Sequence, residues 1–193
     1  IITPYNTPEY SNHFIDLYGA GDATLAEKKE IVMSAIAQTI STVNSVTVRD
    51  LGIKFEGTPG LLNAITDVPG LEVGMVTLIS GDGELISDSG PVRTGVTSIL
   101  PVGKSDTQHA IPAGIYSLNG NGEMTGSHWI NETGGLSGPI MITNTHAVGT
   151  VHRGVIEWVK QNFPEAAMEW LLPVVAETWD GYLNDINGAH ITT

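Results

Sequence analysis

The residues best suited to chemistry lie in a short stretch, Tyr116–Gly126, which contains two consecutive Asn-Gly pairs. Asn-Gly favours tight turns, because both residues accept positive φ angles. Two pairs in succession predict a tight polar loop that follows an apolar run. The loop would gather phenol, amide and carboxylate groups, those of Tyr116, Asn119, Asn121 and Glu123. The same pattern also fits an ordinary surface hairpin turn.

Three further polar segments, residues 143–146, 177–181 and 184–188, follow or lie between expected apolar elements. Their Asn, Thr and carboxylate side chains suit an oxyanion hole and the binding of an ammonium group. They contain no convincing nucleophile, and the sequence has no G-x-S-x-G elbow. Ser127 and His128 are adjacent, so on an extended chain they would point to opposite sides. The chain therefore has the features of most of an active site without the attacking group.

A metal site is not predicted. The six histidines are His13, His109, His128, His146, His152 and His190. No HExxH motif is present, and the pair 146 and 152 would face different sides of an expected helix. Residues 80–83 are glycine-rich but contain no lysine and open no helix, and no Walker or dinucleotide motif occurs. We therefore expect neither a metal nor a nucleotide cofactor.

The overall charge limits the partners. The 193 residues carry a formal net charge of −13, with 8 Lys and Arg against 21 Asp and Glu. A phosphate backbone or an anionic membrane surface would be repelled, so we expect neither nucleic acid nor membrane as a partner. A cationic group such as a substrate ammonium would be attracted. No cysteine is present, which excludes disulfides and thiol catalysis within this sequence.

The sequence also bears on location. No apolar run reaches the roughly 18 residues that cross a bilayer. The sequence starts at Ile1 rather than Met, which fits a removed leader such as a signal peptide. We expect a periplasmic or secreted protein, with the cytoplasm as the alternative.

Strands and helices must position the polar loops. Apolar and β-branched runs predict a short strand and a turn over residues 46–55, and strands over 71–79, 93–102, 113–118, 139–142 and 171–176. The strand at 139–142 should be buried on both faces. Periodic apolar residues predict helices over about 24–43 and up to about 161, the second capped by Thr143 or Thr145. Residues 129–138 should be irregular, and the whole indicates an α/β or α+β fold with a central sheet.

Seven ordered blocks between about Val48 and His190 resemble the α-chain of β-aminopeptidases in the L-aminopeptidase/D-amidase-esterase family. The blocks are Phe55–Gly60, Asn63–Asp67, Arg93–Thr97, Leu118–Gly126, Gly138–His146, Pro173–Thr178 and Leu183–Asn187. Seven blocks in order are far more specific than any single motif. The resemblance divides the chain into 1–45, an arm and amphipathic helix outside the match, and 46–193, the α-chain of an aminopeptidase domain.

The resemblance implies a self-cutting precursor. In that family, cleavage frees a serine at the N-terminus of a second chain, the β-chain, and this serine is the nucleophile with its own α-amine as base. The fold implied is an αββα layered sandwich similar to N-terminal nucleophile hydrolases, incomplete without the second chain. Implied partners are the β-chain, further αβ units in a higher oligomer, and a small peptide or amide substrate with a free amino terminus.

The resemblance also assigns roles to individual residues. Tyr116 matches a tyrosine near the scissile carbonyl. Asn187, with Asn184 as the alternative, matches an asparagine whose side-chain amide is an oxyanion donor. The carboxylate of Glu123 could hold the substrate's amino group. Asn119 and Asn121 belong to the same pocket loop, although each is equally a candidate turn residue.

The expected function is therefore that of an aminopeptidase α-subunit acting on short peptides, amides or esters, including those of β-amino acids. Two alternatives remain open at this stage. One is an acyltransferase of the ornithine acetyltransferase type, in which an amine replaces water as acceptor. The other is a binding subunit with the same fold and no catalysis.

Overall fold

The computed structural model describes residues 48–49, 51–166 and 170–193. The chain divides into two units, Ile1–Pro59 and Gly60–Thr193. In the first unit, the described residues contain turns and no strand, so the strand predicted over 46–55 is wrong where it can be compared. The helix predicted over 24–43 and the predicted boundary at residue 45 lie outside the described residues.

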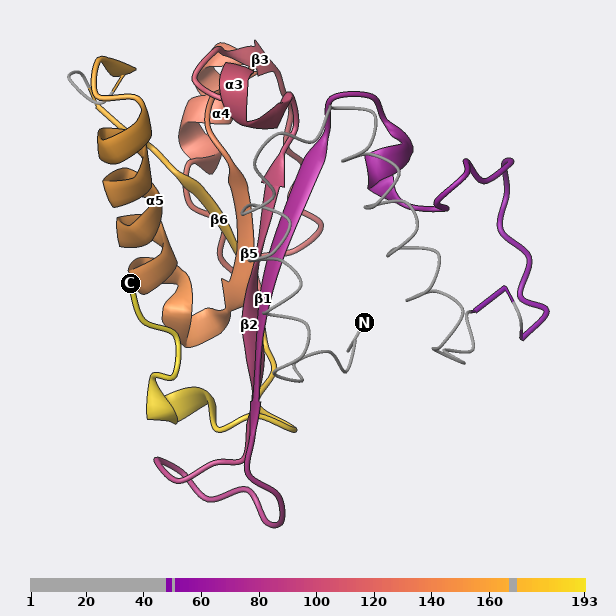
Figure 1. Cartoon of the computed structure of the whole chain (residues 1–193), viewed down its shortest axis with the longest axis vertical. Coiled ribbons are helices and arrows are strands. Elements are labelled where there is room, and N and C mark those ends of the chain that lie inside the picture. Colours follow the sequence, from indigo (N-terminus) through magenta and orange to yellow (C-terminus); the bar gives the residue numbers. More distant parts are fainter. Residues whose placement is uncertain (1–47, 50, 167–169) are drawn as a thin grey trace, which may run out of the picture. The chain divides into compact units, whose positions relative to one another are not determined.

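A four-stranded sheet forms the centre of the second unit, in the order β1-β2-β5-β6 (Figure 1). Its strands are β1 (Glu72–Ser80), β2 (Val92–Leu100), β5 (Ile140–Asn144) and β6 (Val174–Thr178). The pairs β1–β2 and β2–β5 are antiparallel, whereas β5 and β6 run parallel. The four strands predicted from β-branched runs at these places are confirmed to within a few residues.

The register brings distant chain segments to one end of this sheet. Val96 of β2 lies opposite Thr143 of β5, and Asn144 lies opposite Thr178 of β6. Because β2 runs antiparallel to β5, the beginning of β2 meets the ends of β5 and β6 there. The 3-10 helix η4 (Ile186–Gly188), in the yellow C-terminal segment, lies toward this end in Figure 1.

Helix α5 (Val148–Asn162) covers one face of β5 and β6. Its first valines, Val148 and Val151, pack against the fully buried Val175 of β6. The predicted valine face is confirmed, but neither Thr143 nor Thr145 is the cap. The Asn144 side chain instead accepts a hydrogen bond from the Ala147 N–H at 3.0 Å, capping the 3-10 helix η2 (Thr145–Ala147) that leads into α5.

The opposite face of the sheet carries a small layer of short elements. It contains β3 (Ile111–Pro112), α4 (Ser127–Thr133) and β4 (Gly135–Leu136), in which Ile130 and Leu136 pack against Val174. The described second unit also contains the short helices η1 (Ile65–Asp67) and α3 (Gly103–Asp106). No helix in the described parts of the chain has the length and hydropathy to cross a bilayer.

Two predictions in this layer are wrong. The run 113–118 forms no strand, because only residues 111–112 find a partner, in β4. Residues 129–138 are not irregular, since they hold most of α4 and all of β4. Gly134, with a left-handed φ of 66°, ends the helix, and its N–H donates to the Ile130 carbonyl.

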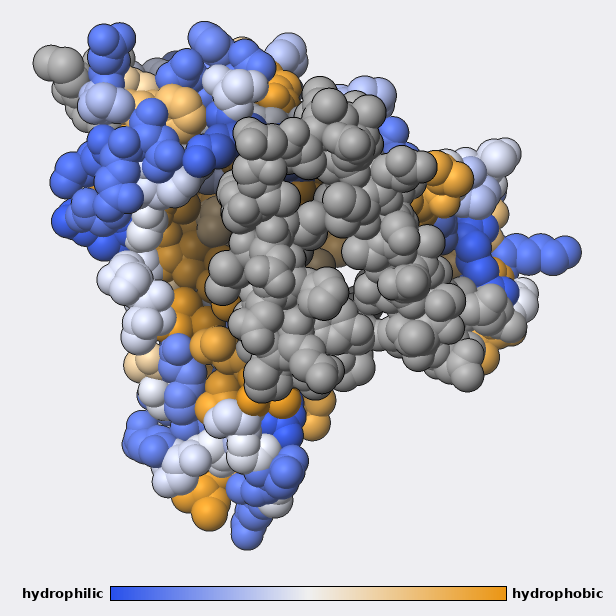
Figure 2. Space-filling view, in the orientation of Figure 1, coloured by the Kyte–Doolittle hydropathy of each residue, from blue (hydrophilic) through white to orange (hydrophobic). Residues whose placement is uncertain are grey.

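Strand β1 has exposed apolar side chains on both of its faces. The neighbours Met75 and Val76 point to opposite faces, yet they are 67% and 62% exposed. Residues 140–142 are half-buried, so the predicted burial on both faces is not observed in this chain. A groove of about 450 Å³ beside α5 is lined by apolar residues such as Met141 and Trp158, and Figure 2 shows hydrophobic surface in this region.

Candidate active site

The end of β6 carries the first group of candidate residues. The segment 123–125 runs antiparallel to β6, with the Glu177 N–H donating to the Glu123 carbonyl and the Thr125 N–H donating to the Val175 carbonyl, both at 3.0 Å. The bridge between Met124 and Ala176 lies between these two bonds. Glu123 is therefore placed opposite Glu177, at the end of the sheet where β5 and β6 finish.

The two Asn-Gly pairs form a self-contained turn. The Asn119 side-chain oxygen accepts from the Asn121 N–H at 2.9 Å, and the Ser117 hydroxyl donates to the Asn119 carbonyl at 2.7 Å. The Asn119 side chain thus serves the turn in this structure. The Asn121 and Glu123 side chains are exposed. Tyr116 is 87% exposed and its hydroxyl makes no hydrogen bond within the described residues, so a second surface would have to enclose it around a substrate.

The side chain of Glu177 lies next to this turn. The sequence analysis did not identify Glu177 as a site residue. One carboxylate oxygen accepts a hydrogen bond from the Thr145 hydroxyl. The other faces Gly122, where a Cβ atom would come within 2.8 Å of it. The available signal was a carboxylate that immediately follows a buried strand, but its contact with the turn is a tertiary feature.

Asn184 and Asn187 occupy very different environments. Asn184 is 1% exposed. Its side-chain oxygen accepts from the Arg93 N–H at 2.9 Å, and its amide nitrogen donates to the Asp180 carboxylate at 3.0 Å. The exposed Asn187 has one long contact, from its amide nitrogen to the Ser87 hydroxyl at 3.4 Å. Asn184 therefore fixes the loop to the start of β2, while the amide of Asn187 is free to meet a ligand.

The buried carboxylate of Asp185 and the ring of His190 pack behind the loop that carries Asn187. The Asp185 carboxylate accepts from the Asp88 N–H and lies beside the ring nitrogen Nε2 of His190, each at 3.1 Å. Burial alone would raise the pKa of Asp185, but the hydrogen bond from Asp88 and the His190 ring outweigh it and hold that pKa below its ordinary value. Gly188 packs between the two side chains, where a Cβ would collide with both. The sequence analysis did not identify this pair, because the fold of η4, and not a recognisable motif, brings Asp185 and His190 together.

A cavity of about 60 Å³ connects this loop to the end of β5. Asn144, His146, Asn187 and His190 are among the residues that line it. The structure thus gathers the loop of Asn187, the end of β5 and the end of β6 at one end of the sheet. Tyr116 makes no hydrogen bond with Asn184 or Asn187 in this structure.

The described residues provide no evident nucleophile or metal site. No serine hydroxyl in residues 48–49, 51–166 and 170–193 is hydrogen-bonded to a histidine. In the same part of the chain, no three His, Asp or Glu side chains cluster closely enough to hold a metal ion. The chemistry available here is hydrogen-bond donation from amides and a hydroxyl, together with the negative charge of carboxylates.

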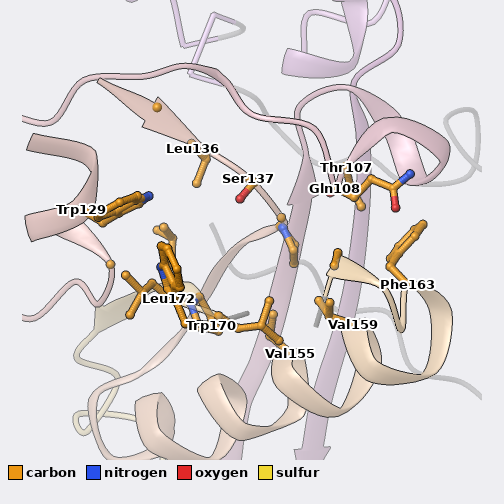
Figure 3. Close-up of a pocket in the computed structure, with 18 of the residues that line it drawn as sticks. Thr107, Gln108, Trp129, Leu136, Ser137, Val155, Val159, Phe163, Trp170 and Leu172 are labelled. Atoms are coloured by element: carbon orange, nitrogen blue, oxygen red, sulfur yellow. The ribbon is translucent and has the colours of Figure 1, made fainter. Parts of the chain in front are cut away.

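A larger pocket of about 420 Å³ lies toward the beginnings of β5 and β6. Figure 3 shows Trp129 and Trp170 on one side of it, Phe163 on the other, and Val155 of α5 between them. The two tryptophan rings meet edge to face with centroids 5.8 Å apart. Its lining contains none of the site residues predicted from the sequence.

Comparison with known proteins defines the class of the fold. The solved structure of the L-aminopeptidase D-Ala-esterase/amidase from Ochrobactrum anthropi matches with a TM-score of 0.68 and 46% identity, covering 75% of this chain and 40% of that one. It is described as a prototype for the serine aminopeptidases and as a variant of the N-terminal nucleophile (Ntn) hydrolase fold. The predicted layered fold similar to Ntn hydrolases is therefore confirmed.

The chain belongs to peptidase family S58, because residues 63–193, more than half of its length, match the model of that family. The β-peptidyl aminopeptidase BapA of Sphingosinicella microcystinivorans is 55% identical over 144 residues, covering 74% of this chain and 35% of the relative. The BapA of Sphingosinicella xenopeptidilytica is 48% identical over 165 residues, covering 83% and 41%. The resemblance to β-aminopeptidases is thus confirmed, and the chain spans less than half the length of these relatives.

Proposed function

We propose that this chain is the α-subunit of a self-processed serine aminopeptidase. The enzyme would release N-terminal residues, including β-amino acids, from short peptides, amides or esters. The observation that carries the proposal is the match of residues 63–193 to peptidase family S58, since that range includes every candidate site residue. In this proposal, a partner β-chain supplies the nucleophile, because the described residues contain no serine bonded to a histidine.

The proposed reaction forms and then hydrolyses an acyl-enzyme. The N-terminal serine of the β-chain attacks the scissile carbonyl carbon, its proton passes to the free α-amine, and the leaving amine departs with a proton. Water then attacks the ester and releases the acid. The Asn187 amide donates to the oxyanion of each tetrahedral intermediate, for which its exposed position on a braced loop is suited. The Tyr116 hydroxyl lies near the same carbonyl once the second chain encloses it.

Recognition of the free amino terminus falls to Glu123 in this proposal. Its carboxylate is exposed at the end of β6 and the chain is strongly acidic, so both short-range and long-range electrostatics favour an ammonium group. An acetylated amino terminus has neither the charge nor all the donors of an ammonium. The enzyme would therefore act on unblocked substrates.

The open sheet surface supports the second chain independently of the chemistry. A helix about 10 Å wide covers roughly two strands spaced about 4.8 Å apart. α5 packs on β5 and β6 and reaches Val96 of β2, but among the described residues β1 keeps exposed apolar side chains such as Met75 and Val76. We propose that the β-chain covers this surface, and that αβ heterodimers assemble into higher oligomers.

Intact mass and one assay test the proposal. The full precursor should yield two chains, the second starting with serine, and the product should hydrolyse a β-amino acid anilide but not its N-acetyl form. A single uncut chain, or equal cleavage of both substrates, would contradict it. Adding an amine acceptor and measuring the transferred acyl group separates hydrolysis from acyl transfer.

A further inference from the structure

The contact between Glu177 and Gly122 joins the end of β6 to the turn that precedes Glu123. One Glu177 carboxylate oxygen is held by the Thr145 hydroxyl, and the other faces the position of a Cβ on Gly122 at 2.8 Å. Thr145 belongs to η2, directly after β5. The carboxylate therefore links the ends of two strands to the turn.

The turn has little other support within the described structure. Among the described residues, the hydrogen bonds of residues 116–122 stay inside that segment, from Ser117 to Asn119 and from Asn121 to Asn119. The backbone bonds to β6 begin only at Glu123. In the part of the chain that the structure describes, the side chain of Glu177 is therefore the part of β6 that lies next to residues 116–122.

A side chain at position 122 would displace the Glu177 carboxylate, whereas the backbone conformation there does not call for glycine. Neither Gly122 nor Gly120 has a φ in the left-handed region. A Cβ on Gly122 would press on the Glu177 carboxylate, whereas a Cβ on Gly120 would meet nothing within 4 Å. Two glycines of one turn thus differ only in whether they contact this side chain, which makes Gly120 a matched control.

We propose that Glu177 is a positioning residue: its carboxylate, anchored by Thr145, supports Gly122 and so fixes the direction in which Glu123 meets the substrate ammonium. The inference rests on the proposed function, in which Glu123 binds that group. Glu177 touches no substrate atom in this account. A small displacement of a group that contacts substrate is costly, because binding groups must be held to within about 0.5 Å of their productive geometry.

The first test compares Gly122→Ala with Gly120→Ala in the full, processed enzyme. Gly122→Ala should push the Glu177 side chain away from Thr145 and raise KM for a β-amino acid anilide about tenfold, with a smaller change in kcat. Gly120→Ala should leave both constants unchanged. In a Glu177→Ala background, Gly122→Ala should have little further effect, because the support is already gone.

The second test asks whether shape or charge matters at position 177. Glu177→Ala should raise KM about tenfold, and Glu177→Gln should restore it, because an amide oxygen can still accept from the Thr145 hydroxyl. Thr145→Val should resemble Glu177→Ala, and Thr145→Ser should not. If Glu177→Gln is as impaired as Glu177→Ala, the charge itself is needed and the positioning role is overturned.

Hydrogen exchange provides a readout independent of activity. Amides of residues 116–123 should exchange faster in Glu177→Ala than in wild type and should recover protection in Glu177→Gln. Unchanged exchange in Glu177→Ala would overturn the inference even if Gly122→Ala fails to fold or process. A wild-type enzyme that does not cleave the anilide would instead refute the proposed function. The exchange experiment would still test whether Glu177 stabilises the turn.

Discussion

The side-chain oxygen of Asn184 accepts a hydrogen bond from the backbone N–H of Arg93 at 2.9 Å, although 91 positions separate the two residues. The bond attaches the C-terminal loop to the first residues of β2. Because Asn184 is also bonded to Asp180 and is fully buried, it is a structural residue in this chain. Asn187, in contrast, is exposed, and its amide nitrogen makes one long contact, 3.4 Å, with the Ser87 hydroxyl.

Asn184→Ala should lower the free energy of unfolding of the processed enzyme by about 1–3 kcal/mol, since it removes two hydrogen bonds of a buried side chain and leaves the half-buried Arg93 N–H without its partner. Asn187→Ala is the matched control and should change stability by less than about 0.5 kcal/mol, because its side chain is exposed. Denaturant unfolding of both variants measures the difference. Equal stability of the two variants would contradict the structural role of Asn184.

Asn187→Ala should lower kcat by about 10²–10³-fold with a smaller effect on KM, because an oxyanion donor acts mainly in the transition state. Steady-state kinetics on a β-amino acid anilide provide the measurement. Intact mass should be recorded in parallel, so that a defect in precursor cleavage is separated from a defect in turnover. Near-wild-type kcat in the cleaved variant would remove Asn187 from the mechanism.

Glu123→Gln should raise KM for free-amino substrates more than it lowers kcat. The expected loss is about 1.5–3 kcal/mol, the range for a hydrogen bond to a charged group. The ratio of activity on free and N-acetylated substrates should fall as well. If Glu123 only stiffens the turn, the variant would melt at a lower temperature with that ratio unchanged, and this result would falsify the ammonium-binding role.

The ion pair at Asp185 should make stability depend on pH in the acid range. The pKa of Asp185 is lowered on folding, so the ionised carboxylate stabilises the folded state above its ordinary pKa of 3.8, and this contribution is lost as pH falls through the lower folded-state value. Denaturant midpoints of wild type and Asp185→Asn should therefore converge as pH is lowered below that point. Asp82→Asn, at an exposed acid, serves as the control. A constant difference between wild type and Asp185→Asn down to about pH 3 would count against this role of the pair.

The chain should depend on its second chain for folding. Among the described residues, β1 exposes apolar side chains on both of its faces, and exposed apolar surface of this kind favours association or loss of fixed packing. Produced alone, the chain should show no cooperative thermal transition, whereas the product of the full precursor should melt cooperatively. A monodisperse isolated chain with a sharp transition would contradict the proposal that the β-chain completes the fold.

Local sequence patterns determined the elements whose signal is strong over many residues. The β-branched runs of β1 and β2 and the valine spacing of α5 place those elements correctly, because period and composition act along the chain itself. The ordered family blocks likewise located the turn of Glu123 and the loop of Asn187. These predictions do not require knowledge of the packing between elements.

Tertiary structure alone decided the remainder. Residues 113–118 have the composition of a strand but pair with no other strand. The short helix α4 lies between two glycines in the left-handed conformation, and the packing of Ile130 against the sheet stabilises it. The support of Gly122 by Glu177 and the burial of Asn184 likewise join segments that lie far apart in the sequence. A hydrogen bond or contact between such segments is fixed by strand register, because register determines which side chains meet at the end of the sheet.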